Sequence, residues 1–190
     1  MPPRVRVTKE DIVSSALELV RKKGAEGLNA RELAAEMGCS TQPIFSNFAG
    51  MEELQSAVAL AAYERYVAFL KNESKSGKYP PYKAFGMAYI RFAREERELF
   101  KLLFMCDRGG KSIDPTPDFV DSVNMIAAAN GISRETAEQV HMEMWICVHG
   151  IATMHATSFL SLDWDVISHM LSDVYQGIRK NLKDAENERN

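Results

Sequence analysis

The chain has 190 residues, of which 46% are hydrophobic and 26% are charged, and this composition excludes a disordered protein. Its net charge of −3 excludes a protein that coats nucleic acid irrespective of sequence. No apolar run approaches the roughly 20 residues of a membrane helix, and no signal segment opens the sequence. Three scattered cysteines without metal-ligand spacing predict a cytoplasmic location, where thiols stay reduced.

The first predicted element is an amphipathic helix over residues 8–23. Thr8 is suited to cap its beginning, and Gly24 to end it after a basic last turn. Between these ends the apolar residues have the spacing of one buried helical face: Ile12, Val13, Ala16, Leu17 and Val20.

Two short helices around a tight turn are predicted over residues 29–48. Asn29 is a good N-cap, and Glu32 three residues later completes a capping-box pattern. Gly38 is suited to the left-handed backbone that ends a helix, and Ser40 to cap the second helix. Helix, glycine-containing turn and helix form the helix-turn-helix pattern, whose second helix enters the DNA major groove.

The rest of the chain also reads as helical. A fourth helix begins near Met51 and runs to about Leu70, and a polar linker follows over 74–81. Beyond it we expect a loop over 107–117, a polar tail over 184–190, and helices over 82–95, 98–106, 118–130, 133–158 and 164–182. The sequence thus predicts an all-α fold of about nine helices. A three-helix DNA-binding head (1–66) precedes a larger helical ligand-binding and dimerisation body (67–190).

The head resembles that of the TetR-type transcriptional regulators. Gly38-Cys39-Ser40, Ile44-Phe45-Ser46-Asn47-Phe48 and Met51-Glu52-Glu53-Leu54 are similar to that family's Gly-Val-Ser, Leu-Tyr-x-His-Phe and Lys-Glu-x-Leu elements, in the same order and spacing. The similarity covers about residues 8–66. In the body, Trp145-Ile146-Cys147-Val148-His149-Gly150 resembles a Trp-x-x-x-His-Gly subgroup. The resemblance implies an all-helical homodimer with a helix-turn-helix head and a ligand-binding body.

Three positions depart from the family pattern. Phe45 stands where the family usually has Tyr, Asn47 where it has His, and Met51 where it has Lys. These departures predict fewer phosphate contacts and weaker non-specific DNA binding.

Residues at the exposed N-terminal end of the second helix of the motif are the candidate base readers. Short polar and methyl-bearing side chains read base edges in the major groove, and the candidates are Thr41, Gln42, Pro43 and Ser46. Phe45 and Asn47 are expected beside them against the DNA. The candidate phosphate contacts are Arg4, Arg6, Thr8 and Arg31. The alternatives are a surface helix of an ordinary bundle and, for the two N-terminal arginines, a solvated terminus.

The body is rich in methionine and aromatic residues, which predicts either a well-filled core or an adaptable apolar cavity. Trp145 and His149 are four residues apart on one helix and share a face. For His149, a core hydrogen bond and a ligand contact both remain open. The candidate ligand-binding residues are Phe92, Phe100, Phe104, Met105, Met125, Trp145 and His149.

No metal, cofactor or catalytic centre is predicted. The histidines on the long helix over 133–158 are too spread around its axis for a compact metal site. The sequence also holds no Gly-rich phosphate loop and no nucleophile motif. We therefore do not expect an enzyme.

Long apolar stripes on the last two helices predict dimerisation, with part of each stripe packed inside the chain. They consist of Val140, Met144, Cys147, Ile151, Met154, Ile167, Leu171, Val174 and Ile178. The sequence and the resemblance together predict a transcriptional repressor that binds a palindromic operator as a homodimer. A small apolar or amphipathic molecule would release it. The alternatives are a DNA-binding regulator without a small-molecule effector and a helical interaction protein.

Overall fold

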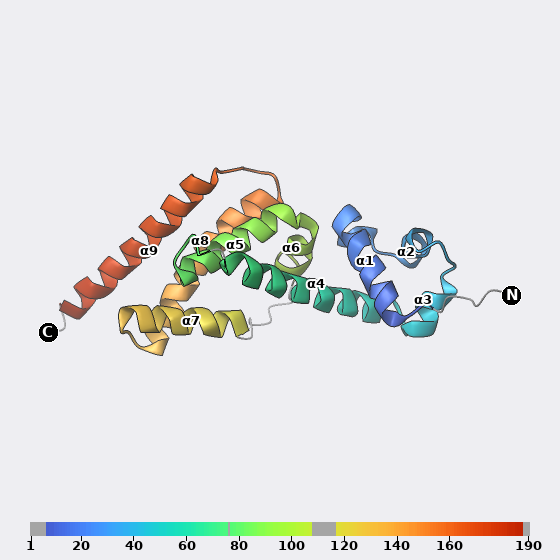
Figure 1. The fold of residues 1–190 in the computed structure, drawn as a ribbon, viewed down its shortest axis with the longest axis horizontal. Helices are drawn as coiled ribbons and strands as arrows, with labels where there is room; N and C mark the ends of the chain where they lie inside the picture. Colours follow the sequence, from blue (N-terminus) through green and yellow to red (C-terminus); the bar gives the residue numbers. More distant parts are fainter. Residues whose placement is uncertain (1–6, 76, 108–116, 188–190) are drawn as a thin grey trace. The chain divides into compact units, whose positions relative to one another are not determined.

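The structure, a computed structural model, describes residues 7–75, 77–107 and 117–187, and its regular elements in these ranges are all helices (Figure 1). This confirms the predicted all-α fold for the described residues. The α-helices are α1 (Lys9–Lys23), α2 (Ala30–Glu36), α3 (Gln42–Asn47), α4 (Met51–Ser74), α5 (Pro81–Glu95), α6 (Arg97–Phe104), α7 (Pro117–Asn130), α8 (Arg134–Ala156) and α9 (Trp164–Asn187). A short 3-10 helix, η1 (Ala25–Gly27), follows α1.

The chain divides into two compact units. The first unit comprises Met1–Phe69 and Glu95–Asp107, and the second comprises Leu70–Arg94 and Arg108–Asn190. Helix α6 therefore packs with the N-terminal helices, although the sequence analysis placed it in the body. The expected functional division between residues 66 and 67 stays a prediction.

Both predicted ends of α1 are confirmed. Oγ1 of Thr8 accepts a hydrogen bond from the amide of Asp11 at 3.1 Å, and Oδ2 of Asp11 accepts one from the amide of Thr8 at 3.0 Å. The two residues form a reciprocal capping box. Gly24 ends the helix with φ of 76°, in the region that glycine adopts without steric cost.

Two cap predictions in the helix-turn-helix need correction. Oδ1 of Asn29 caps α2 by accepting from the amides of Arg31 and Glu32 at 3.1 and 3.0 Å. The carboxylate of Glu32, however, pairs with Lys23 instead of completing a capping box. The N-cap of α3 is Thr41 and not Ser40, because the carbonyl of Thr41 accepts the first hydrogen bonds of that helix.

The core of the first unit forms where α1 contacts α2, α3 and α6. Ile44 and Phe48 face inward from α3 and its C-cap and are buried. Gly38 has φ of 63° in the turn between α2 and α3, so the chain reverses there without strain. Burial of one face of α3 leaves its other face outward.

The second unit is held together by contacts of α7 with α8 and of α8 with α9. Its core includes the buried residues Val123, Ile126, Ala137 and Val140. Helix α9 continues to Asn187, so the polar tail predicted from residue 184 was wrong for its first residues. Among these first residues, Ala185 and Glu186 have high helix propensity.

The predicted loop over 107–117 lies almost entirely outside the described residues, apart from Asp107 and from Pro117, which opens α7. Among the described helices, none is both long enough and apolar enough to cross a membrane.

Candidate functional site

Helix α3 presents a small polar surface. All six residues that the sequence analysis selected in 41–47 lie in α3 or at its N-cap. Gln42, Phe45 and Ser46 are exposed, whereas Thr41, Pro43 and Asn47 are half-buried. Gln42 is the first residue of α3, so its long amide side chain stands at the outward N-terminal end of the helix.

Two polar side chains of α3 fold back onto their own helix. The hydroxyl of Ser46 donates to the carbonyl of Gln42 at 2.9 Å, and Nδ2 of Asn47 donates to the carbonyl of Pro43 at 2.8 Å. These bonds occupy the hydroxyl proton of Ser46 and one amide proton of Asn47. Ser46 is then left with acceptor lone pairs for an outside partner.

Arg31 is the candidate phosphate contact that the structure leaves accessible. It is exposed in the first turn of α2, and no ion pair holds it among the described residues. Thr8 is exposed, but its Oγ1 already accepts the capping bond from Asp11. Arg4 and Arg6 lie outside the described residues.

The three lysines of α1 have acidic partners within the first unit. They form the ion pairs Lys9–Glu53, Lys22–Glu36 and Lys23–Glu32. The Nζ of Lys9 also lies 4.6 Å from the centroid of the Phe48 ring. The basic residues of α1 are therefore neutralised locally, which agrees with the absence of a strongly basic net charge.

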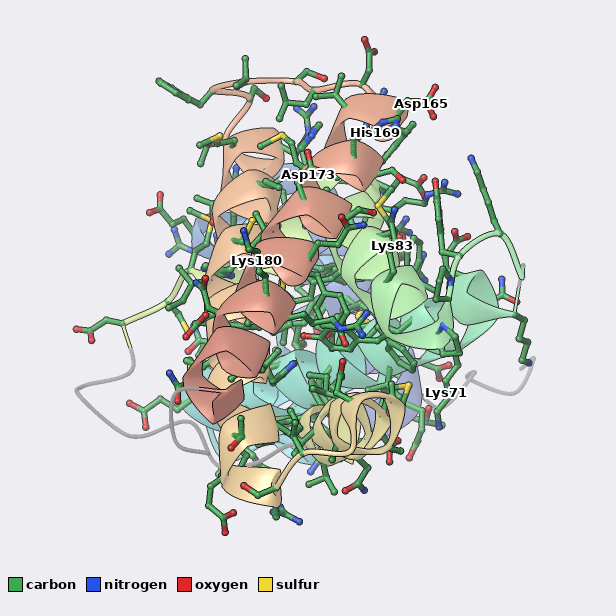
Figure 2. All side chains as sticks on the ribbon, turned by 90° about the vertical axis from the view of Figure 1, so that its left-hand side faces the viewer. Lys71, Lys83, Asp165, His169, Asp173 and Lys180 are labelled. Carbon is green, nitrogen blue, oxygen red and sulfur yellow. The ribbon has the colours of Figure 1, made fainter. Side chains whose placement is uncertain are left out.

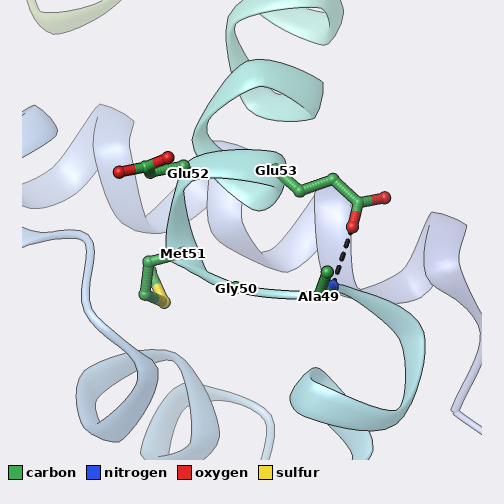
Figure 3. Close-up of a pocket in the computed structure, with 5 residues that line it drawn as sticks. All are labelled: Ala49, Gly50, Met51, Glu52 and Glu53. Atoms are coloured by element: carbon green, nitrogen blue, oxygen red, sulfur yellow. Dashed lines mark hydrogen bonds between the residues drawn. The ribbon is translucent and has the colours of Figure 1, made fainter.

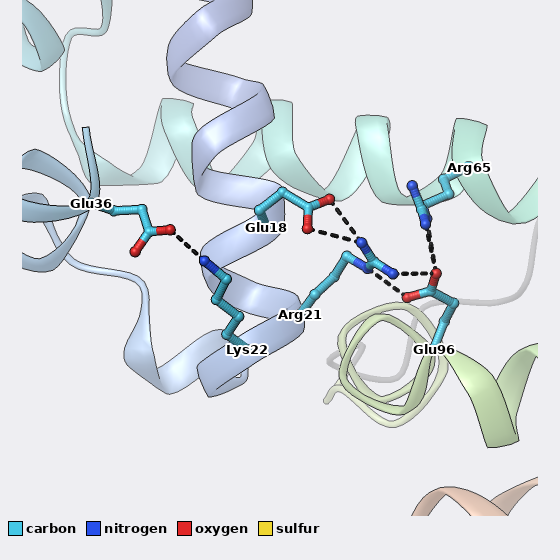
Figure 4. A network of polar contacts seen from close by, with 6 residues as sticks. All are labelled: Glu18, Arg21, Lys22, Glu36, Arg65 and Glu96. Atoms are coloured by element: carbon cyan, nitrogen blue, oxygen red, sulfur yellow. Dashed lines mark hydrogen bonds and ion pairs between the residues drawn. The ribbon is translucent and has the colours of Figure 1, made fainter.

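A buried carboxylate joins three helices of the first unit (Figure 4). Glu96, the N-cap residue of α6, is 9% exposed. It accepts hydrogen bonds from Arg21 of α1 at 2.7 and 2.8 Å, and from Arg65 of α4 at 2.7 and 3.1 Å. Burial raises the pKa of the Glu96 carboxyl, but the bonds from the two arginines outweigh it, and the net pKa lies below its usual value.

A surface pocket of about 500 Å³ lies where α4 begins (Figure 3). Met51 is half-buried there, and it occupies the position where the TetR-type pattern usually has lysine. Oε2 of Glu53 accepts a hydrogen bond from the amide of Ala49 at 2.7 Å. The first turn of α4 thus carries one methionine and two acids, Glu52 and Glu53.

The seven predicted ligand residues are divided between the two units. Phe100, Phe104 and Met105 belong to the first unit, and Phe92, Met125, Trp145 and His149 to the second. In the first unit, Phe100 and Phe104 are in ring contact at 5.2 Å, and Met105 is exposed. In the second unit, Phe92 is fully buried, which makes it a core residue in this structure.

Trp145 and His149 meet as the sequence predicted. Their rings stack with centroids 4.9 Å apart and planes 16° apart, and both side chains are half-buried. Nδ1 of His149 is hydrogen-bonded to the hydroxyl of Tyr89 on α5 at 2.9 Å. Burial lowers the pKa of His149, so its ring is neutral at pH 7 and presents one donor and one acceptor.

A second tyrosine–histidine pair repeats this arrangement. The hydroxyl of Tyr82 is hydrogen-bonded to Nδ1 of His141 at 3.0 Å, and burial raises the pKa of the Tyr82 hydroxyl. The tyrosines are seven residues apart on α5 and the histidines eight apart on α8, so both pairs join the same two helices. The sequence analysis missed the tyrosines, although these matched spacings were a usable signal.

The histidines of α8 do not converge on a metal site. His141 and His149 pair with the two tyrosines, and His155 stacks on Trp164 with ring centroids 6.1 Å apart. In the described ranges, no three histidine, cysteine or acidic side chains are grouped so that they could hold a metal ion.

Helices α8 and α9 and the loop between them carry most of the large apolar side chains that the second unit leaves exposed. They are Met142, Ile146, Met154, Phe159, Leu160, Val166 and Met170. Of the predicted dimerisation stripes, Val140, Met144, Ile151, Ile167 and Leu171 are buried within the chain, in line with the expectation that part of each stripe packs internally. Figure 2 shows Asp165, His169 and Asp173 following one another along α9.

Comparisons with known proteins relate the chain to one family of transcriptional regulators. Residues 82–174 match the model of the family described as "Tetracyclin repressor-like, C-terminal domain". The chain is 22% identical over 170 residues to the uncharacterized HTH-type transcriptional regulator Rv0681 of Mycobacterium tuberculosis, with 85% of this chain and 77% of that protein covered.

Solved structures share the fold. A TetR family protein from Vibrio parahaemolyticus superposes with a TM-score of 0.62 at 17% identity, covering 88% of this chain and 96% of that one. The multidrug binding protein EbrR, complexed with imidazole, superposes with a TM-score of 0.55 at 17% identity, covering 92% and 97%.

Proposed function

The chain belongs to the TetR-type family of transcriptional regulators, and on this premise we propose that it is a ligand-responsive repressor. It would bind a palindromic operator as a homodimer and leave the DNA when a small apolar or amphipathic molecule binds its second unit. The observation that carries the proposal is the outward polar end of α3. There Gln42 is exposed, while Ile44 and Phe48 anchor the opposite face in the core.

The proposed DNA surface consists of the exposed side of α3 with the start of α2. Gln42 has the amide geometry that reads adenine in the major groove, and Phe45 is exposed beside it. Arg31, without an ion-pair partner among the described residues, supplies a charge for a phosphate. Phosphate contacts fix the register of the helix on DNA, and base contacts supply the specificity.

A palindromic operator requires two copies of the head, and the exposed apolar residues of α8 and α9 support a homodimer. Several large apolar side chains left exposed on two neighbouring helices are typical of an interaction site. Ile146, at 61% exposure, is the most exposed apolar side chain of α8. An isologous contact through these two helices would bring the same residues of both copies together.

The stacked Trp145 and His149, with the Tyr89 hydroxyl, support an effector that has an aromatic or apolar body and one hydrogen-bonding group. Ligand sites in proteins combine apolar walls with a few polar groups that orient the ligand. The similar protein EbrR is described as multidrug binding and was solved with imidazole, which is a small ring with hydrogen-bonding nitrogens. The effector would act by binding the DNA-free conformation more tightly than the DNA-bound one.

A titration of the full chain against DNA from upstream of its own gene tests the proposal. We expect a complex that weakens steeply with salt and that forms more tightly than on a random-sequence duplex of equal length. A panel of small aromatic and amphipathic molecules should then contain compounds that raise the melting temperature and dissociate the complex. Equal affinity for the upstream and random-sequence DNA would contradict the proposed regulator function. A panel without any compound that dissociates the complex would contradict the proposed ligand response.

A further inference from the structure

The ammonium group of Lys9 lies beside the residue that ends α3, the helix that carries most of the proposed DNA surface. Its Nζ lies 2.7 Å from Oε1 of Glu53 in the first turn of α4. The same Nζ lies 4.6 Å from the centroid of the Phe48 ring, at the residue that ends α3. Lys9 is itself the first residue of α1. The charge is therefore positioned where α1 begins, α3 ends and α4 begins.

This ion pair is open to water. The side chains of Lys9 and Glu53 are 46% and 45% exposed, so solvent and salt screen their attraction. The cation–π contact is of a different kind, because Phe48 is buried and cannot leave. Its ring face attracts the lysine ammonium weakly, and this attraction does not depend on Glu53 as a partner.

Glu53 keeps favourable interactions when Lys9 is removed. Its Oε2 accepts a hydrogen bond from the amide of Ala49 at 2.7 Å (Figure 3), and a carboxylate is stabilised at a helix N-terminus. The hydrogen bonds from Lys9 and from the Ala49 amide lower the pKa of Glu53, so it is ionised at neutral pH. Lys9 can therefore leave Glu53 for another anion without leaving an unsupported acid behind.

We propose that Lys9 is a phosphate-binding residue of the DNA surface and that Glu53 competes with DNA for it. In the free protein the ammonium binds Glu53. On DNA it turns to a backbone phosphate oxygen while the Phe48 ring keeps its position. The inference rests on the proposed DNA-binding function, and it adds both a contact residue and an internal competitor to that function.

The competition lowers affinity for every DNA sequence alike, because phosphate contacts carry no sequence information. Glu53→Gln removes the competing charge but keeps an oxygen that accepts from the Ala49 amide. It should tighten binding about 2- to 5-fold, the range expected for releasing one exposed ion pair. Lys9→Gln should weaken binding and reduce the slope of log affinity against log salt by about 1.

The experiment compares five full-length proteins: the wild type, Lys9→Gln, Glu53→Gln, the double variant and Glu138→Gln. Each is titrated at several salt concentrations against the upstream DNA and against a random-sequence duplex, after thermal unfolding has shown that it folds. Glu138→Gln removes the same unit charge from an exposed arginine pair of α8. This variant measures the effect of net charge alone on the DNA affinity. Lys9→Met, which also removes the charge and keeps the length of the side chain, replaces Lys9→Gln if the latter does not fold, and should reduce the slope in the same way.

We expect Glu53→Gln to increase the affinity for both DNAs in the wild-type background and to have no effect on it in the Lys9→Gln background. The increase should be larger than that caused by Glu138→Gln. Equal tightening in both backgrounds would overturn the proposal, because Glu53 would then act by direct repulsion of the DNA. An unchanged salt slope in Lys9→Gln would overturn it too. A wild type that forms no salt-sensitive complex contradicts the proposed function itself, a result distinct from either of these.

Discussion

The carboxylate of Glu96 accepts two hydrogen bonds from the guanidinium of Arg21, at 2.7 and 2.8 Å, and so ties the start of α6 to α1. Arg65 of α4 donates to the same carboxylate. A single buried acid thus joins three helices that lie far apart in the sequence. Movement of α6 relative to α1 or α4 must break or reorganise these bonds, which makes Glu96 the most informative position for a stability measurement.

Glu96→Gln should lower the free energy of unfolding at neutral pH by about 1–3 kcal/mol, the range for hydrogen bonds to a charged group. Because Arg21 and Arg65 are partly exposed, we expect the lower half of that range. The folded-state pKa of Glu96 lies below the unfolded value of 4.5. The stabilisation is therefore complete above that value and is lost as pH falls through the folded-state pKa.

Urea unfolding at neutral pH and at about pH 3 measures this dependence. The wild type and Glu96→Gln should differ at neutral pH and converge in acid. Glu138→Gln, in an exposed pair, should match the wild type at both. A difference for Glu96→Gln that is independent of pH would rule out the charge as its origin.

Gln42→Ala should relax base preference and leave stability nearly unchanged. The side chain is exposed at the first position of α3, so its removal costs little packing. Loss of a bidentate base contact removes about 1–3 kcal/mol of discrimination at one base pair. Binding to a set of single-base operator variants measures it, with Gln176→Ala on α9 as a control for loss of an exposed glutamine. Wild-type affinity and preference in Gln42→Ala would remove this residue from the reading surface.

Arg31→Gln should weaken binding to all DNA sequences by a similar factor and reduce the salt slope by about 1. The reason is that Arg31 has no ion pair among the described residues, and its full charge is therefore available to a phosphate. Arg134→Gln, which removes an equal charge from α8, serves as the control. A loss of affinity confined to the specific operator would instead identify Arg31 as a base reader.

Ile146→Asp should dissociate the proposed homodimer, since it places a charge in the middle of the exposed apolar surface of α8. Leu60→Asp is a matched control on α4, because Leu60 is 60% exposed and Ile146 61%. Sedimentation velocity at several protein concentrations measures the oligomeric state. The Ile146 variant should be monomeric where the wild type and the Leu60 variant are dimeric. Equal dissociation of both variants would place the contact elsewhere.

Local sequence signals sufficed for the beginnings and ends of several helices. Thr8, Gly24, Asn29 and Gly38 act at the helix ends where the sequence predicted them, because capping depends on residues within one turn of each other. The N-cap of α3 was predicted one residue too early. Ser40 and Thr41 are both N-cap residue types, and the observed cap is identified by the carbonyl that accepts the first helical bonds.

Some features of the candidate site also followed from local sequence signals, and others did not. The exposure of Gln42 at the N-terminal end of α3 followed from the helix-turn-helix pattern. The position of Trp145 and His149 on one face of α8 followed from their spacing of four. The partners of Lys9, Glu96 and His149 did not follow, because each lies on a helix distant in sequence, and a single sequence carries no record of such contacts.

The sequence by itself determined an all-helical chain, the helix-turn-helix and the family resemblance, because these depend on periodicity, caps and motif order along the chain. Only the tertiary structure decided which charges are available. It paired Lys9 with Glu53, buried Glu96 between two arginines and left Arg31 without an ion pair among the described residues. Availability of a charge depends on what folding brings within a few ångströms of it, and for these residues that partner comes from another helix.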